Sequence, residues 1–355
     1  MKTKSSNFLN LAFNIAKINL GKTGKNPSVG CVVVKDNSVI SSGITSINGR
    51  PHAEFNALSY KKNFKNAHMY VTMEPCVHYG VTPPCTNIII RKGIKKVYFS
   101  NYDFDKRTFK KSKINLKKRG VIAQKKTIQK YKNFYKSYYL FKKKALPLID
   151  AKIAVSKDFY TIKKKSKWIT SELSRKKAHL IRSNYDCIIS TSKSINKDNS
   201  LLNCRINGFN KNKPDLIIID TNNKIKKKLK LFNNKKRKIF VVTKREKLKK
   251  DVFFIKKKIN QISINSLVNK KDFIDLFKLI KNKGYSRVLI ECGLTFLNKL
   301  IINKLVNNLY IFQSAEKLLN NGKNNASNSY LKNIKLRNKI NVYLGNDSLY
   351  KIRIK

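Results

Sequence analysis

Four residues in the first quarter of the chain have the types and spacing that hold a catalytic metal ion. His52 is followed by Glu54, and Cys76 and Cys85 each come directly after a proline. One imidazole and two thiolates suit a tetrahedral Zn²⁺ whose fourth position stays open for water, and the pKa of such a water falls toward ~7. A carboxylate two residues after the histidine is placed to carry a proton from that water to a leaving amine. The pattern indicates hydrolytic chemistry with one Zn²⁺ per chain.

Two plainer interpretations of these residues exist. Cysteine is among the most buried residue types, so each thiol alone is explained as a core residue and the histidine as a helix cap. A closed structural zinc site is the other interpretation, and it needs a fourth ligand, for which His78 is the local candidate. The joint pattern and the position of Glu54 favour catalysis over both.

The strong positive charge of the chain does not by itself indicate a function. The 355 residues include 79 Lys+Arg and 19 Asp+Glu, a formal net charge of +60. Runs such as Lys226–Lys228 could contact a phosphate backbone, but the lysines are spread over the whole chain without interleaved aromatic residues that would stack on bases. We therefore expect a solvated surface that attracts phosphorylated small molecules, and no nucleic-acid partner.

The composition predicts a cytoplasmic globular protein. No apolar stretch approaches the ~18–20 residues that cross a bilayer, so no membrane partner is expected. The six cysteines show no even spacing, which favours reduced thiols over a disulfide framework. The basic N-terminus indicates an amphipathic helix rather than a targeting segment. The apolar face of that helix comprises Leu9, Ala12, Phe13, Ala16 and Leu20.

Two α/β domains are expected, residues 1–145 and 146–355, with the boundary near Leu146-Pro147. In the first domain, β-rich runs alternate with helical spacing, and Asp36-Asn37 predicts a hairpin turn. The strands expected there are Val29–Lys35, Ser38–Gly43, Met69–Thr72 and Val97–Ser100; the helices are Pro51–Lys61, Thr86–Arg91 and part of Lys125–Lys144.

In the second domain, strand–helix alternation predicts a mostly parallel sheet with helices on its faces. No Gly-x-Gly-x-x-Gly fingerprint of an ordinary dinucleotide-binding fold is present. The expected strands are Ile149–Val155, Cys187–Thr191, Leu216–Asp220, Ile239–Thr243 and Val288–Glu291, and the expected helices are Ser171–Ser183 and Lys271–Lys283.

Two strings around the zinc-ligand candidates resemble a known family. Residues 26–34 (Asn-Pro-Ser-Val-Gly-Cys-Val-Val-Val) are similar to the substrate loop and first strand of the cytidine deaminase-like superfamily, and residues 74–85 to its segment between the cysteines. Eight residues separate Cys76 from Cys85, whereas nucleotide and tRNA deaminases usually have two between their cysteines. The longer gap resembles the deaminase half of the bifunctional riboflavin-biosynthesis deaminase/reductases. The resemblance implies an α/β/α deaminase domain in which Asn26 contacts the substrate.

The resemblance continues into the family's reductase half, whose fold is similar to dihydrofolate reductase. The similar strings are residues 152–158, 166–170, 179–182, 198–205 and 291–295. The resemblance implies that NADPH contacts Ala154, Trp168, Ser194, Asp198, Thr221, Gly293, Leu294 and Thr295. It implies that the ribosyl substrate contacts Ser166, Arg182, Leu202, Arg205 and Glu291.

Simple physical roles can be attached to some of these residues. Gly293, at a strand-to-helix turn, would present N–H groups to a pyrophosphate, and Arg182 and Arg205 would hold a substrate phosphate. Without the resemblance, core or solvated-surface roles are the more ordinary interpretation of all these positions. Phe159 departs from the family, which has glycine after Asp158, and a bulky residue is disfavoured in a turn that glycine allows.

The resemblance as a whole implies a bifunctional, homodimeric enzyme of riboflavin synthesis. The first domain would hydrolytically deaminate the phosphorylated substrate 2,5-diamino-6-ribosylamino-4(3H)-pyrimidinone 5′-phosphate. The second would reduce the ribosyl group to ribityl with NADPH. Two alternatives are a nucleic-acid-editing deaminase and a non-catalytic RNA-binding or structural protein. The long gap between Cys76 and Cys85 and the second domain count against the first, and the intact set of His52, Glu54 and both cysteines counts against the second.

Overall fold

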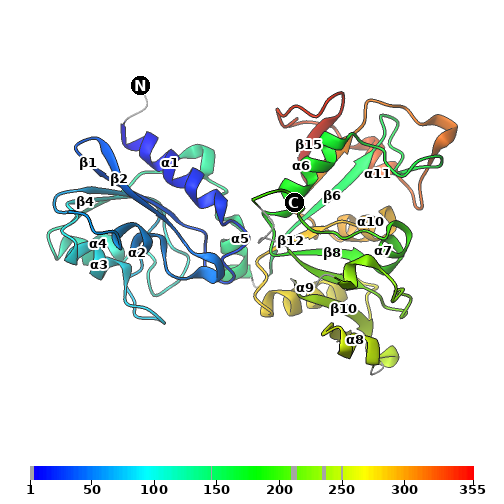
Figure 1. Cartoon of the computed structure of the whole chain (residues 1–355), viewed down its shortest axis with the longest axis horizontal. Coiled ribbons are helices and arrows are strands. Elements are labelled where there is room, and N and C mark those ends of the chain that lie inside the picture. Colours follow the sequence, from blue (N-terminus) through cyan, green and yellow to red (C-terminus); the bar gives the residue numbers. More distant parts are fainter. Residues whose placement is uncertain (1–3, 145, 209–213, 234–236, 249–250) are drawn as a thin grey trace. The chain divides into compact units, whose positions relative to one another are not determined.

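In the computed structural model the chain forms two compact units, Met1–Ala145 and Leu146–Lys355 (Figure 1). The structure describes residues 4–144, 146–208, 214–233, 237–248 and 251–355. No helix within these ranges is long and apolar enough to cross a membrane. Each unit is built around its own main sheet with helices on both faces, so the predicted α/β class is confirmed.

Unit 1 contains a five-stranded mixed sheet in the order β2-β1-β3-β4-β5. β1 is antiparallel to β2 and β3, while β3, β4 and β5 run parallel. The hairpin turn predicted at Asp36-Asn37 is confirmed, because both residues have the positive φ that a tight hairpin requires, 49° and 60°. The strands are β1 (Gly30–Lys35), β2 (Ser38–Ile44), β3 (His68–Met73), β4 (Lys96–Asn101) and β5 (Ile122–Lys125).

Helices cover both faces of this sheet because β1 is apolar on both sides. α1 packs Leu9 and Ala12 against one face of β1, and α2 and α3 pack against the other. α1 ends at Ile18, so Leu20, which was expected on its apolar face, lies beyond the helix. The helices are α1 (Lys4–Ile18), α2 (Ala53–Leu58), α3 (Cys85–Arg91), α4 (Ser112–Lys117) and α5 (Lys136–Tyr139), with a 3-10 turn η1 (Ile47–Gly49).

The end of unit 1 contains the helix that was expected within Lys125–Lys144. Part of residues 125–144 was expected to be helical, and residues 136–144 are: α5 continues directly into the π-helical turn η3 (Leu140–Lys144), and the 3-10 turn η2 (Gln129–Tyr131) precedes them. Tyr131, Tyr135 and Tyr138 all lie in the core of unit 1, so the segment is anchored to the sheet through its aromatic side chains.

Unit 2 contains an eight-stranded sheet in the order β11-β10-β9-β8-β12-β6-β13-β15. All neighbouring pairs are parallel except β13 and β15, so the prediction of a mostly parallel sheet is confirmed. Its strands are β6 (Leu148–Val155), β8 (Cys187–Thr191), β9 (Asp215–Ile219), β10 (Ile239–Lys244), β11 (Asn260–Ile264), β12 (Arg287–Ile290), β13 (Asn308–Gln313) and β15 (Ser348–Arg353); β7 (Ile162–Lys163) and β14 (Gly322–Lys323) form a separate pair.

Helices α9 and α10 pack on one face of the large sheet, and α6, α7 and α8 on the other. Since the strands are parallel, the loops that follow β6, β8, β9 and β12 leave the sheet at one edge, where ligands of open α/β sheets bind. The helices are α6 (Glu172–Arg182), α7 (Ser192–Asp198), α8 (Val252–Lys256), α9 (Lys270–Asn282), α10 (Leu294–Ile302) and α11 (Ser329–Asn333), with short turns η4 (Lys230–Asn233), η5 (Arg245–Lys247) and η6 (Leu319–Asn321).

Candidate active sites

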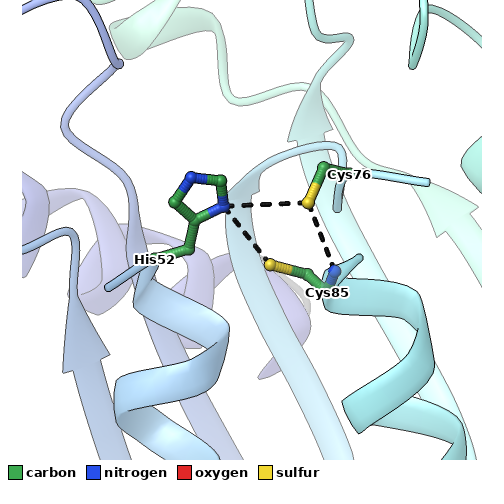
Figure 2. A group of neighbouring side chains, drawn as sticks. All are labelled: His52, Cys76 and Cys85. Atoms are coloured by element: carbon green, nitrogen blue, oxygen red, sulfur yellow. Dashed lines mark hydrogen bonds between the residues drawn. The ribbon is translucent and has the colours of Figure 1, made fainter. Parts of the chain in front are cut away.

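Three side chains converge in unit 1 where two helices begin (Figure 2). His52 is the N-cap of α2, Cys85 is the first residue of α3, and Cys76 lies in the segment that follows β3. The Nδ1 atom of His52 is 3.7 Å from the Sγ atom of Cys76 and 3.4 Å from that of Cys85. All three ligand atoms lie within 4.8 Å of one another.

These separations fit a tetrahedral zinc ion. Zn–S and Zn–N bonds of about 2.3 and 2.0–2.1 Å at a tetrahedral angle place the nitrogen and sulfur atoms roughly 3.6 Å apart. The backbone N–H of Cys85 donates to Sγ of Cys76 at 3.2 Å, which favours a thiolate there. Hydrogen bonds from the Cys85 thiol and from His52 lower the pKa of Cys76 to about 4 despite burial.

The geometry also bears on the alternative of a closed structural site. His78, the candidate fourth ligand, is not among the grouped metal-binding side chains of the described residues. Its Nδ1 atom is instead 2.9 Å from Oγ1 of Thr108. A three-residue donor set with one position open is the arrangement of catalytic zinc sites.

Glu54 lies within the first turn of α2, two residues after His52, and its side chain is buried. Burial raises the pKa of Glu54 to about 7, although the nearby His52 lowers it. A carboxyl group with such a pKa can both accept and release a proton near neutral pH. Asn26, expected at the substrate, donates from Nδ2 to the Gly49 carbonyl at 2.9 Å, which ties its loop to the turn before His52.

The loop after β4 is fixed next to the cysteine segment by one buried carboxylate. Glu74 accepts backbone N–H groups from Asp103, Lys110 and Ser112 at 3.1–3.3 Å. The cysteine segment and this loop therefore hold a fixed relation to each other, and the contact of His78 with Thr108 adds to it.

In unit 2 the loop after β12 meets the loop after β8. Gly293 is the N-cap of α10, and its N–H donates to Oγ of Ser194 at 3.1 Å, while Thr191 also donates to that oxygen at 3.1 Å. Gly293 and Thr295 are exposed, whereas Leu294 is buried. The first-turn N–H groups of a helix have no partner within the helix, so the start of α10 fits a pyrophosphate group of a dinucleotide.

The remaining residues expected near the cofactor, and Ser166, expected at the substrate, lie on or next to β6, α6, α7 and β9. Ala154 is half-buried on β6, Asp198 ends α7, and Thr221 follows β9. Trp168 is 54% exposed, and the Arg175 guanidinium carbon lies 4.7 Å from its ring centroid. Ser166 is exposed and donates from its hydroxyl to the Trp168 carbonyl at 3.2 Å.

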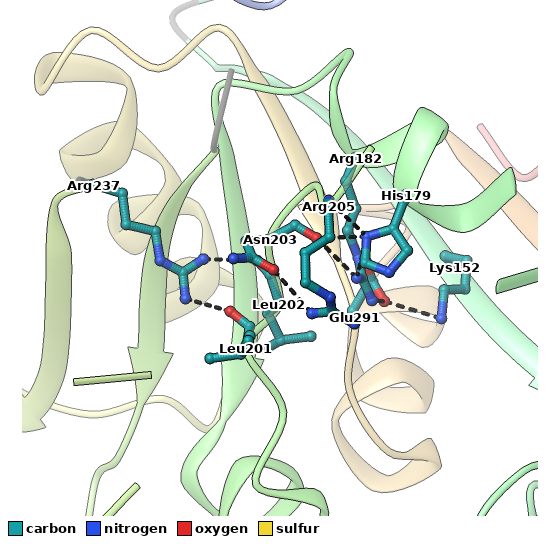
Figure 3. Close-up of polar contacts among 9 residues, drawn as sticks. All are labelled: Lys152, His179, Arg182, Leu201, Leu202, Asn203, Arg205, Arg237 and Glu291. Atoms are coloured by element: carbon teal, nitrogen blue, oxygen red, sulfur yellow. Dashed lines mark hydrogen bonds and ion pairs between the residues drawn. The ribbon is translucent and has the colours of Figure 1, made fainter. Parts of the chain in front are cut away.

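A buried carboxylate with two cationic partners follows β12 (Figure 3). Glu291 Oε1 lies 2.5 Å from Nε of Arg182, and Oε2 lies 2.8 Å from its Nη2 and 2.9 Å from Nζ of Lys152. Burial would raise the pKa of Glu291, but Arg182 and Lys152 hold it far below its usual range. Glu291 is therefore an anion in the folded protein.

The two arginines expected to bind phosphate have different surroundings. Arg182 uses Nε and Nη2 on Glu291 and donates from Nη1 to the Asn203 carbonyl at 3.1 Å. Arg205 is exposed; its Nη1 donates to Oδ1 of Asn203 at 3.0 Å, and its backbone N–H lies 3.3 Å from Nδ1 of His179. Most of the donors of Arg205 thus point away from any partner described here, whereas those of Arg182 are used internally.

Phe159 adopts the turn that was expected to disfavour it. Its φ is +64°, so a phenylalanine occupies the left-handed conformation where the family has glycine. Asn324 and Asn328 donate from Nδ2 to its carbonyl at 3.2 and 3.0 Å, and its ring packs against the core of unit 2. The turn is held by these contacts rather than by a permissive residue.

Three residues of this site were not singled out from the sequence. Lys152 and His179 lie within the family-like strings, but only the structure places them against Glu291 and Asn203. Arg237 lies in a lysine-rich stretch with no motif, and it donates to the carbonyls of Leu201 and Leu202. No sequence signal distinguishes it from its basic neighbours.

Comparisons with known proteins cover both units. The family described as RibD C-terminal domain matches residues 147–337, and the cytidine and deoxycytidylate deaminase zinc-binding region matches residues 2–101. The riboflavin biosynthesis protein RibD of Buchnera aphidicola subsp. Baizongia pistaciae is 31% identical over 331 residues, 88% of this chain and 87% of that protein. A diaminohydroxyphosphoribosylamino-pyrimidine deaminase of Buchnera aphidicola subsp. Acyrthosiphon pisum is 36% identical over 135 residues, 36% of this chain and 92% of that protein.

Solved structures show the same fold. A deaminase/reductase of Thermotoga maritima superimposes with a TM-score of 0.84 at 24% identity, covering 99% of this chain and 98% of that one. RibD of Acinetobacter baumannii gives 0.83 at 24% identity, with coverages of 99% and 98%.

Proposed function

The chain belongs to the RibD family of riboflavin-biosynthesis proteins, and on that basis we propose which residues carry its two activities. The protein is an enzyme of riboflavin biosynthesis with deaminase and reductase activities. It hydrolytically deaminates 2,5-diamino-6-ribosylamino-4(3H)-pyrimidinone 5′-phosphate and then reduces the ribosyl group to ribityl with NADPH. We assign residues 1–145 to the deaminase and 146–355 to the reductase.

The grouping of His52, Cys76 and Cys85 within 4.8 Å, with buried Glu54 beside it, is the observation that carries the deaminase assignment. A zinc ion held by these three residues would supply the Lewis acid that activates water. Glu54 would accept a proton from water and deliver it to the departing ammonia. Asn26, whose loop is tied to the turn before His52, contacts the pyrimidine ring.

In the reductase, the residues at the sheet edge divide into two groups. Ala154, Trp168, Ser194, Asp198 and Thr221, with the start of α10 (Gly293, Leu294 and Thr295), hold NADPH, which supplies the hydride. Ser166, Arg182, Leu202, Arg205 and Glu291 surround the ribosyl substrate. Arg205 takes the 5′-phosphate, because its guanidinium is exposed, while Arg182 orients Glu291. A homodimer and a cytoplasmic location are further proposals, which rest on the family resemblance.

A two-part assay on purified zinc-loaded protein tests the assignment. The diaminopyrimidinone ribosylamino phosphate is supplied, ammonia release is followed first, and NADPH oxidation is followed next. We expect both signals in sequence. Ammonia release without NADPH oxidation would remove the reductase assignment, and absence of both would remove the whole proposal.

A further inference from the structure

A short irregular segment of unit 2 is held by cationic side chains on two sides (Figure 3). This segment, residues 201–205, follows α7 and contains neither helix nor strand. Leu202 has a φ of +46°, a backbone conformation that costs a leucine free energy. The segment contains Leu202 and Arg205, both assigned above to the ribosyl substrate. Its conformation must therefore be set by contacts with the rest of the unit.

On one side, the segment is held by α6. Nδ1 of His179 lies 2.8 Å from the Asn203 carbonyl oxygen and 3.3 Å from the backbone nitrogen of Arg205, and Arg182 donates from Nη1 to the same carbonyl at 3.1 Å. Burial, followed by the charges of Arg182 and Arg205, lowers the pKa of His179 to about 4, so it is neutral at physiological pH. These contacts hold the carbonyl of Asn203, but they do not reach the carbonyls of Leu201 and Leu202, whose side chains pack in the core of unit 2.

On the other side, Arg237 binds that part of the backbone. It precedes β10, and its Nη1 donates to the Leu202 carbonyl at 2.7 Å while Nη2 donates to the Leu201 carbonyl. Its Nε atom is buried without a hydrogen-bond partner among the described residues. Burial lowers the pKa of Arg237 to about 10. Desolvating a guanidinium and leaving one N–H unpaired costs free energy. The two hydrogen bonds of Arg237 to backbone carbonyls have to offset this cost.

We propose that Arg237 is a positioning residue of the reductase: by holding the carbonyls of Leu201 and Leu202 it keeps Leu202 in its left-handed conformation and so directs Arg205 toward the substrate. The bidentate geometry matters, because a planar guanidinium fixes two successive carbonyls at once and thereby fixes the peptide plane between them. The assignment of a substrate to residues 201–205 rests on the proposed function. The role of Arg237 in holding the backbone of these residues does not.

The inference predicts a specific kinetic pattern. In Arg237→Met, KM for the ribosyl substrate should rise about 10- to 100-fold, because small displacements of positioning groups have effects of that size. KM for NADPH should change less than about two-fold, since the start of α10 is untouched. Arg237→Lys keeps the positive charge but cannot bind two carbonyls with one planar group, so its KM for the ribosyl substrate should rise to an intermediate extent. Millimolar guanidinium should partly restore Arg237→Met.

Arg287 provides a matched control in the same unit. Like Arg237, Arg287 donates to a backbone carbonyl, in this case from Nε to Asn184 at 2.7 Å. Its guanidinium carbon lies 5.1 Å from the centroid of the Tyr185 ring. It begins β12, whereas Gly293 and Glu291 follow the opposite end of that strand. Arg287→Met should lower the unfolding midpoint to a similar extent as Arg237→Met while leaving the KM for the ribosyl substrate within two-fold of wild type.

Hydrogen exchange separates this inference from the proposed function. In protein without ligands, the amides of residues 201–205 should exchange at least about ten-fold faster in Arg237→Met than in wild type, and not faster in Arg287→Met. Unchanged exchange in a folded Arg237→Met protein, or an equal increase in both variants, would overturn the positioning role. If Arg237→Met fails to fold, Arg237→Lys is measured by the same criterion. Failure of the proposed function would appear separately, as wild-type protein that does not oxidise NADPH.

Discussion

The backbone N–H of Cys85 donates to the Sγ atom of Cys76 at 3.2 Å, so the first residue of α3 contacts both proposed metal ligands that precede it in the chain. This contact joins the beginning of α3 to the segment after β3. Replacement of Cys76 therefore removes the acceptor of this bond, whereas replacement of the Cys85 side chain leaves its backbone donor in place.

Cys85→Ser should lower bound zinc well below one per chain, because a hydroxyl is a much poorer zinc ligand than a thiolate. Metal content of the purified protein, measured by mass spectrometry, checks this. Cys187→Ala, at a buried thiol of β8 in unit 2, is the control and should keep its zinc. Full zinc occupancy in Cys85→Ser would remove Cys85 from the ligand set.

Glu54→Gln should leave zinc bound and reduce ammonia release by at least about 10²- to 10⁴-fold, since the amide cannot shuttle a proton. Glu172→Gln is a suitable control, because Glu172 is exposed and pairs with Lys176 on the surface of α6. The measurement is the initial rate of ammonia release in each variant. A wild-type rate in Glu54→Gln would contradict the proton-transfer role of Glu54.

Zinc removal should affect the two activities unequally. Chelation is expected to abolish ammonia release, while reduction of the already deaminated substrate by NADPH continues, because the described metal ligands all lie in unit 1. Both rates are measured before and after zinc is restored. Equal loss of the two activities, recovered together on addition of zinc, would show that unit 2 depends on the metal.

Phe159→Gly should be more stable than Phe159→Ala by about 1 kcal/mol, because alanine keeps the penalty of a positive φ that glycine avoids. Urea unfolding of the two variants gives the difference. At Phe253, within helix α8, the order should reverse, with alanine more stable than glycine. The same order at both positions would indicate that backbone conformation does not determine the effect at Phe159.

Glu291→Gln should weaken the acid dependence of stability. The folded-state pKa of Glu291 is depressed by Arg182 and Lys152, so its contribution is complete above its unfolded pKa of about 4.3 and is lost as the pH falls below that value. The free energies of unfolding of wild type and variant should therefore converge as the pH decreases from about 5 toward 3. A constant difference over that range would contradict this assignment of charge.

Much of the fold could be predicted from local patterns. The runs that became β1, β6, β8 and β10 are rich in valine and isoleucine, and the turn at Asp36-Asn37 consists of residues that tolerate positive φ. Strands β5, β11 and β15 were not expected, because polar and basic residues interrupt their apolar pattern. Strand β13 was also missed, although its four central residues form an uninterrupted apolar run.

The residues of the candidate sites also differ in how far the sequence predicts them. His52, Cys76 and Cys85 could be grouped in advance because metal ligation demands particular residue types at particular spacings. The contacts of Lys152 and Arg237 could not, because lysine and arginine are abundant along the chain and their partners are distant in sequence. In the case of Arg237 the partners are backbone carbonyls, which carry no sequence information at all.

Because His52 and Cys85 lie at the starts of α2 and α3, we expect the supply of metal to influence how much of the protein a cell retains. An ion held by His52, Cys76 and Cys85 would tie together three separate parts of unit 1, and its binding energy would add to the energy of folding. A chain made during zinc shortage would open more often and be degraded sooner. Scarcity of the metal would then reduce the abundance of both catalytic halves, although only one of them is proposed to need zinc for its chemistry.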